Sequence, residues 1–130
     1  MNQLSGYTEV EIAGDVLPFK FGTNAWALFC DMHKIEIGQI GTSGIFGKVD
    51  EQGNIGSPDL SKLRDIFYCG YQSACRSKGV QPKYNLYEFG DLIDESVDIV
   101  SKLQETMLRA KVMGYSLTGR DEGNPQMPGQ

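Results

Sequence analysis

The sequence has few of the side chains that enzymes use for nucleophilic or metal-dependent chemistry. Its 130 residues include one histidine, His33, and three cysteines, Cys30, Cys69 and Cys75. A catalytic triad needs the histidine beside an activated serine or cysteine, and a structural zinc site needs four ligands in paired spacing. Cys30 lies one helical turn before His33 but belongs to an apolar stripe, and the other two cysteines point in different directions on one predicted helix. We therefore expect no catalytic residue, no metal and no cofactor, with the three thiols reduced and free.

Long apolar runs and an excess of positive charge are also missing. No hydrophobic segment approaches the roughly 20 residues that a membrane-spanning helix needs. The first residues, Met1–Ser5, lack the basic and then apolar pattern of a signal peptide. The net charge is −5, whereas binding to nucleic-acid phosphates requires a positive surface. These absences predict a cytosolic protein with neither a membrane nor a nucleic acid as its partner.

Glycines are frequent between residues 38 and 56, but they do not form a nucleotide-binding pattern. A phosphate-binding loop needs a glycine five positions before a Gly-Lys pair and a hydroxyl residue directly after that pair. Around Gly47-Lys48 these two positions hold Thr42 and Val49, and the chain has no Gly-x-Gly pair. The stretch predicts either a small hairpin that turns at Gly53 or a long mobile loop.

Three acids in the second half have the spacing of a carboxylate cluster. Glu88, Asp91 and Glu95 are separated by three and then four residues, and paired carboxylates can bind metal or transfer protons. The predicted helix is interrupted near Asp94, however, and acids at a helix start are explained by the helix dipole alone. We assign them no catalytic role.

What the sequence does contain is a clear alternation of strand and helix patterns. Residues 7–12 and 16–21 alternate apolar and polar side chains on either side of a tight turn at Gly14, which predicts a β-hairpin. Beyond Gly22, where Thr23 or Asn24 can cap a helix, the apolar residues of 24–34 take helical spacing. We expect this helix to cover the apolar face of the hairpin, with Phe21, Trp26 and Phe29 buried.

Three further helices are predicted. One starts at Ser57-Pro58-Asp59 and ends at Gly79, with Gly70 marking a close helix crossing; a short one spans 84–93. Asp94 caps the last, whose predicted buried stripe consists of Val97, Val100, Leu103, Met107 and Ala110. The fold class is thus α+β: an N-terminal β-hairpin packed on a bundle of about four helices. Residues 1–115 form this single domain, and 116–130 form a disordered tail rich in Gly, Pro, Gln and Asn.

Several apolar motifs resemble one known family. They are Phe19-x-Phe21-Gly22-x-Asn24-Ala25 followed by Leu28-Phe29-Cys30, then Leu63-x-x-Ile66-Phe67-Tyr68-x-Gly70, and then Tyr87-x-Phe89-Gly90-Asp91-Leu92-Ile93-Asp94. Over about residues 7–113 the chain resembles the tail assembly chaperones of long-tailed bacteriophages and prophages. The glycine-rich stretch at 38–56 departs from that family, which usually links its first two helices more plainly.

The resemblance implies a non-enzymatic protein of the host cytoplasm that is absent from the finished virion. Such chaperones coat the long helical tape measure protein, keep it soluble and recruit tail tube subunits around it. A longer form made by translational frameshifting occurs in some members of the family. Two alternatives remain open: a structural virion component, such as a head–tail connector or minor tail protein, and a small hydrolase or metal protein.

The predicted partner surface lies on the last helix. Ile99, Leu108 and Val112 fall off the predicted buried stripe, and exposed apolar residues on a helix can bind an apolar helix of a partner. The same residues would also favour self-association, so a homo-oligomer is expected to be possible.

Overall fold

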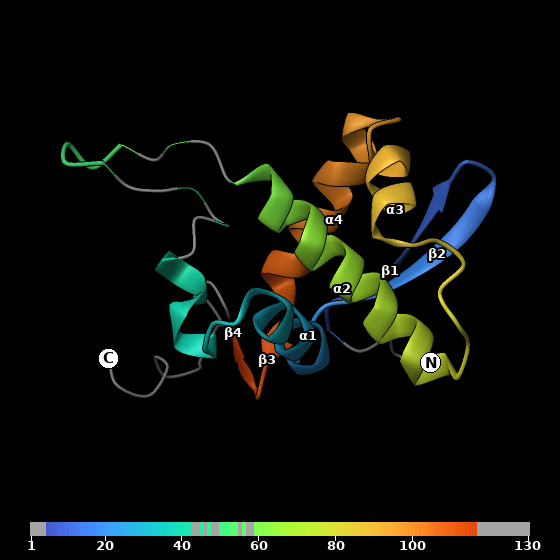
Figure 1. The fold of residues 1–130 in the computed structure, drawn as a ribbon, viewed down its shortest axis with the longest axis horizontal. Helices are drawn as coiled ribbons and strands as arrows, with labels where there is room; N and C mark the ends of the chain where they lie inside the picture. The colour runs from blue at the N-terminus through green and yellow to red at the C-terminus, as the bar shows by residue number, and fades with distance from the viewer. Residues whose placement is uncertain are drawn as a thin grey trace.

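The computed structural model describes residues 5–42, 45, 47, 50–54, 56 and 59–116. Its elements follow in this order: β1 (Tyr7–Ile12), β2 (Asp15–Lys20), α1 (Thr23–His33), the 3₁₀ helix η1 (Ile37–Thr42), α2 (Leu60–Lys78), α3 (Leu86–Ile93), α4 (Val97–Arg109), β3 (Lys111–Val112) and β4 (Tyr115–Ser116). The α+β prediction is confirmed, because a two-stranded antiparallel hairpin packs against four helices (Figure 1). The predicted tail lies, except for its first residue, outside the described residues. Most of the glycine-rich stretch 38–56 is described, and it begins with η1, a helical turn that the sequence did not predict.

The hairpin pairs β1 with β2 antiparallel, from Tyr7 opposite Lys20 to Ile12 opposite Asp15. Its two turn residues, Ala13 and Gly14, have φ values of 53° and 85°. Positive φ at both central residues is the mark of a type I′ turn, whose twist suits a hairpin. The predicted turn is confirmed.

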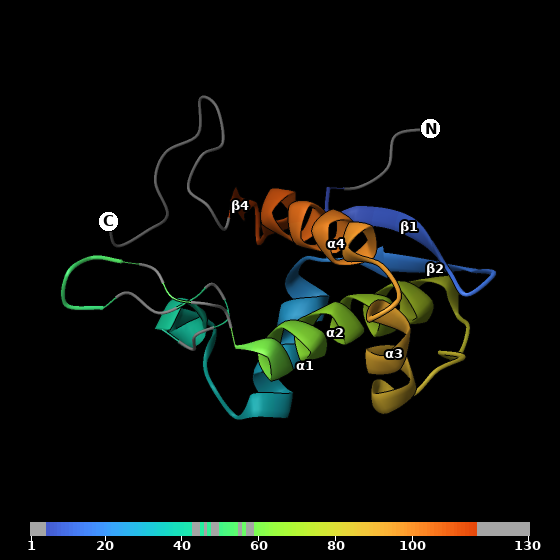
Figure 2. The same cartoon turned by 90° about the horizontal axis from the view of Figure 1, so that it is seen from above.

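The hairpin is covered by α2 and α4, and not mainly by α1 as predicted. α2 packs along β2, α4 contacts β1, and α1 packs chiefly against α2. Figure 2 shows the hairpin beside α4 and over α2. The apolar spacing of α1 indicated correctly that one face is buried, but spacing alone does not identify the element that buries it.

An aromatic cluster joins β2 to α2 and α3. The Phe19 ring lies 5.9 Å from that of Phe89 and 6.0 Å from that of Tyr71, and the Phe21 ring lies 6.2 Å from that of Phe67. All five rings are at most 1% exposed. Aromatic pairs at these separations add to the stability that burial itself provides.

The contact between α1 and α2 is equally enclosed. Trp26 and Phe29 are fully buried, as is Phe21, which confirms the three predictions of burial. The Trp26 and Phe29 rings meet edge to face at 5.6 Å. The core therefore continues from the hairpin through α2 to α1.

Gly70 leaves space on α2 for a close neighbour, and this neighbour is a side chain that follows β2 and not another helix. A Cβ at Gly70 would lie 2.5 Å from a ring carbon of Phe21, which follows β2. No real Cβ contact is this short, so only glycine leaves space for the ring. The predicted helix crossing at Gly70 is thus wrong in its partner.

The helix ends differ from the predictions at three positions. Asp59 caps α2 by accepting from the amides of Ser61 and Lys62, and Ser57 lies outside the described residues. Ser96, not Asp94, caps α4, because Asp94 still ends α3 and the next residues form the connection. At α1 the cap position is held by Gly22, without any side-chain cap.

In the part of the chain that the structure describes, no helix has both the length and the apolar character needed to cross a membrane.

Candidate functional site

The single histidine pairs with a buried acid that sequence patterns did not single out. His33 Nε2 lies 2.8 Å from Asp65 Oδ2, and Arg64 contacts the other carboxylate oxygen at 2.8 Å. Asp65 is buried on α2 although it is charged. The pair joins the last turn of α1 to α2. In the sequence, the only sign of this pair is an acid, Asp65, inside a largely apolar helix face.

All three thiols of the chain are poor nucleophiles. Burial raises the pKa of Cys69 to about 12, and burial also raises the pKa of Cys30 and of Cys75. A thiol must be ionised to attack a carbonyl or bind a metal, so these groups stay inert near neutral pH.

Of the three acids that have the spacing of a cluster, Glu88 caps a helix. Glu88 forms a capping box with Asn85 at the start of α3, where each accepts a backbone amide of the other. Among the described residues, no group of three or more His, Cys, Asp or Glu side chains is placed to hold a metal ion. Glu88 is therefore explained by the helix start, as the sequence indicated.

Two of the three predicted partner residues are inaccessible. Ile99 and Val112 are only 8% and 6% exposed, whereas Leu108 is 38% exposed. Val112 also lies beyond α4, in β3. The stripe that α4 buries consists of Ile99, Leu103 and Met107, followed by Ala110 directly after the helix, so the prediction that Ile99 stays available is wrong.

The error has a simple cause, because α4 offers two overlapping apolar stripes. Leu103 and Met107 belong to both. Before Leu103, one stripe continues through Val100 to Val97 in steps of three residues, and the other reaches Ile99 in one step of four. The structure buries Ile99 and leaves Val97 exposed. Helical periodicity could not decide between the two stripes, since steps of three and of four residues both keep side chains on one helix face.

The accessible apolar surface lies instead in a groove between the starts of α2 and α4 and the length of α3. This groove has a volume of about 450 Å³. Its apolar lining consists of Leu60, Leu63, Phe67, Tyr87, Ile93 and Val100. We call it the α2–α3–α4 groove. Its rim is polar and carries Ser61, Arg64, Asp91 and Asp94.

Two large side chains of this groove are strongly exposed. Leu60 is 79% exposed and Tyr87 is 74% exposed. The guanidinium of Arg64 lies 5.5 Å from the centre of the Tyr87 ring, which holds the aromatic side chain at the groove edge. Gly90 lets α3 approach this arginine, because a Cβ there would lie 3.2 Å from Arg64 Cδ.

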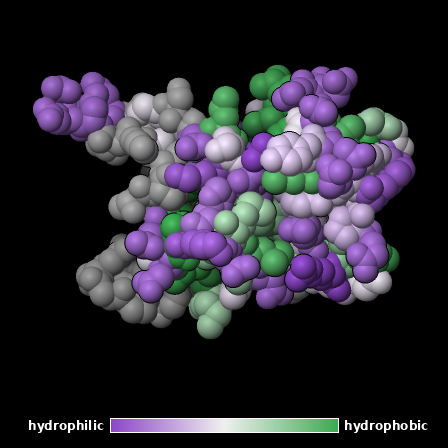
Figure 3. Space-filling model, viewed as in Figure 1, coloured by the Kyte–Doolittle hydropathy of each residue, from purple (hydrophilic) through white to green (hydrophobic). Residues whose placement is uncertain are grey.

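Figure 3 shows hydrophobic patches among hydrophilic ones over the region of α2, α3 and α4. Exposed apolar side chains that occur singly, such as Val16 and Val80, need no explanation in a folded protein. Several that gather around one groove are different, since contiguous apolar surface with a polar rim is typical of a binding site. The groove can bind an apolar group, but it contains no arrangement that would perform a reaction.

Comparisons with known proteins assign the chain to no family. No family model, no curated protein and no solved structure matches it. What the chain does must therefore be inferred from its own residues and from the sequence resemblance described above.

Proposed function

We propose that the chain is a non-catalytic tail assembly chaperone that binds the tape measure protein through the α2–α3–α4 groove. The observation that carries the proposal is the exposure of Leu60 and Tyr87 beside an apolar hollow. Neither side chain is needed to complete the core. The resemblance of residues 7–113 supplies the identity of the partner.

The groove suits one apolar stripe of a partner helix. Helix-in-groove recognition places apolar anchors, spaced three or four residues apart, against a hydrophobic groove. A tape measure protein is a long helical chain whose apolar stripes need such a cover to stay soluble. At the rim, Arg64 can pair with acids beside the stripe, and Asp91 and Asp94 can pair with bases.

The remaining parts of the proposal follow from the same role. A chaperone that coats the tape measure would act in the host cytoplasm and recruit tail tube subunits to the coated helix. A second copy of this chain is a further possible occupant of the groove, so a homo-oligomer would compete with tape measure binding. Partner binding would then convert the oligomer to a mixed complex.

Co-expression with the tape measure protein of the same genome tests the proposal. The wild-type chain should keep the tape measure soluble and co-purify with it. The double variant Leu60→Asp/Tyr87→Asp should lose both effects, because it places charge in the groove without altering the core. The matched control Val16→Asp/Val80→Asp adds the same charge at exposed apolar sites that do not line the groove, and it should behave as the wild type does.

Two results would overturn this function. One is a wild-type chain that never retains the tape measure or tube protein and is found in mature particles, which would identify a structural virion component. The other is equal loss of binding in the groove variant and in the control. The predicted residues Ile99 and Val112 are unsuitable for this test, because aspartate at either buried position would disrupt the fold.

A further inference from the structure

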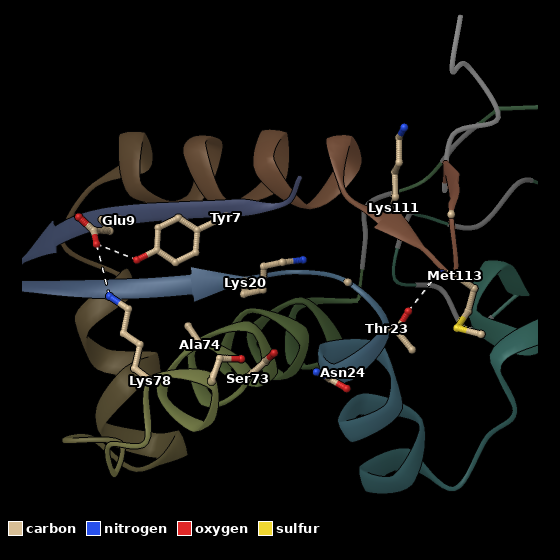
Figure 4. A pocket seen from close by; sticks show the side chains of 13 residues that line it. Tyr7, Glu9, Lys20, Thr23, Asn24, Ser73, Ala74, Lys78, Lys111 and Met113 are labelled. Carbon is tan, nitrogen blue, oxygen red and sulfur yellow. Dashed lines mark hydrogen bonds and ion pairs between the residues drawn. The ribbon is translucent and has the colours of Figure 1, made fainter. Parts of the chain in front are cut away.

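A second pocket, with a basic lining, lies between the hairpin, the start of α1, α2 and β3 (Figure 4). It has a volume of about 840 Å³ and shares no residue with the α2–α3–α4 groove. Its charged lining consists of Lys20, Lys78 and Lys111 against one acid, Glu9. A local excess of lysine is unexpected in a chain whose net charge is −5.

The start of α1 opens on this pocket without a cap. Gly22 holds the cap position and offers no side chain, and the first turn of α1 contains no acid. The first backbone bond of the helix is donated by Trp26 to the carbonyl of Gly22. The N–H groups before Trp26 therefore point out of the helix, at the positive end of its dipole.

The ammonium of Lys20 lies directly over this helix start. A Cβ at Gly22 would be 2.8 Å from Lys20 Nζ, which donates to the carbonyl of Phe21 at 3.1 Å. The Lys20 side chain is half-buried, and this burial lowers the pKa of its ammonium group. Two positive groups thus adjoin in a partly desolvated place, an arrangement that a bound anion would stabilise.

A buried hydroxyl points into the same space. Ser73 is only 3% exposed, and its Oγ has no hydrogen-bond partner among the described residues. In Figure 4 its side chain is directed toward the region between Lys20 and Asn24. Buried polar groups almost always have a partner, so this hydroxyl indicates a ligand that would accept its proton.

The other polar groups of the pocket are consistent with an anionic ligand. Thr23 Oγ1 accepts from the amide of Met113 at 3.0 Å and so keeps its own proton to donate. The Glu9 carboxylate already has partners, because Tyr7 donates to it at 2.7 Å and Lys78 lies 3.5 Å from it. Lys111 stands at the rim with its ammonium directed away from Ser73 in Figure 4.

From these contacts we infer that the pocket binds an oxyanion, either a carboxylate or a phosphate group. Its ligands are the ammonium of Lys20, the hydroxyl of Ser73 and the free amides at the start of α1. A carboxylate would come from an acidic side chain of a partner, and a phosphate from a small molecule. The inference is independent of the groove and of the chaperone function.

Two titrations at constant ionic strength distinguish these sources. One uses inorganic phosphate, and the other uses a blocked Ala-Glu-Ala tripeptide, with chloride as the reference salt. The readout is the backbone amide shift of residues 22–25 in ¹⁵N–¹H spectra. We expect saturable shifts with at least one probe, and the probe that binds more tightly identifies the source.

The variants decide whether the pocket is responsible. Lys20→Met should weaken binding about tenfold or more, and Ser73→Ala by roughly two- to tenfold, the range of one hydrogen bond. Lys62→Met removes the same charge at the start of α2 and should leave the affinity unchanged. Ser73→Ala is expected to fold normally, because it deletes only a hydroxyl without a partner. The inference is overturned if neither probe produces saturable shifts, or if both pocket variants bind as the wild type does.

Discussion

The first turn and the middle of α2 both carry large apolar side chains, but these lie in opposite surroundings. Phe67 and Tyr71 are enclosed by β2 and α3, with their rings in contact with Phe21 and Phe19 respectively. One helical turn before Phe67, Leu63 is buried as well, whereas Leu60 in the first turn is open to solvent. The start of the helix does not depend on burial of Leu60, because Asp59 caps it by accepting from the amides of Ser61 and Lys62. The comparison shows that apolar side chains of one helix serve the fold in its middle and remain uncovered in its first turn.

The largest expected effect is the loss of a ring from the enclosed region. Phe29→Ala should lower the free energy of unfolding by about 3–5 kcal/mol, as for other buried aromatic residues, because the cavity cannot fully close. Leu60→Ala should change it by no more than about 0.5 kcal/mol. Urea melts of both variants measure the contrast. A loss under about 1 kcal/mol for Phe29→Ala would contradict its placement in the core.

Thiol reactivity extends the comparison to chemistry. With the Cys69 pKa raised from 9.0 to about 12, the native thiol is ionised about a thousandfold less than a free one near neutral pH. An alkylating reagent should therefore modify Cys69 only after unfolding, whereas the thiol of a Leu60→Cys variant should react in the folded protein. Peptide mapping after timed alkylation measures both. Fast native modification at Cys69 would show that this part of α2 is not enclosed.

Gly70 tests how tightly the enclosed region is packed. Alanine is the better helix former by about 1 kcal/mol, yet Gly70→Ala should destabilise the fold by a net amount of about 1–3 kcal/mol because of the contact with the Phe21 ring. In a Phe21→Leu background, Gly70→Ala should lower the free energy of unfolding by a smaller amount, since the rigid ring is gone. Equal costs in the two backgrounds would mean that the ring is not the obstacle.

The smallest expected effect concerns an exposed contact that ties the hairpin turn to the chain after α2. Asp15 accepts hydrogen bonds from Lys83 at 2.8 Å and from the Tyr84 hydroxyl, and these bonds lower its pKa. A lowered pKa stabilises the folded state above the usual carboxyl pKa of about 4, and that contribution disappears as the pH falls through the lowered value. Asp15→Asn should therefore lose slightly less stability between about pH 5 and pH 2 than the wild type. Acid titrations of the wild type and of Asp15→Asn, followed by circular dichroism, measure this difference. An identical loss of stability in the two proteins would show that the contact does not contribute.

Local patterns in the sequence predicted the elements well. The hairpin with its turn at Gly14, and the end of α2 at Gly79, follow from strand alternation and from glycine at positive φ. Contacts between residues that are far apart in the sequence could not be predicted from these local patterns. The placement of α1 against α2, the choice of Ile99 over Val97 in α4 and the contact of Gly70 with Phe21 all depend on which faces meet in three dimensions.

The candidate sites were hidden for the same reason. The α2–α3–α4 groove is formed by residues separated by up to 40 positions, and the basic pocket by residues that extend from Tyr7 to Gly114. Leu60 and Tyr87 have ordinary helical spacing, so only the structure shows that they are uncovered. Conversely, Ile99 and Val112 were expected to be accessible because the sequence does not show how α4 and β3 pack.

Hydrogen exchange of the chain in complex with the tape measure protein tests the central claim most directly. Amides of residues 60–64 and 86–94, which border the α2–α3–α4 groove, should exchange more slowly in the complex than in the free chain. Amides of the enclosed segment 66–75 should be slow in both states, because the fold already protects them. Slower exchange confined to other surfaces, or unchanged exchange at the groove in a complex that does form, would contradict the assignment of the groove as the partner site.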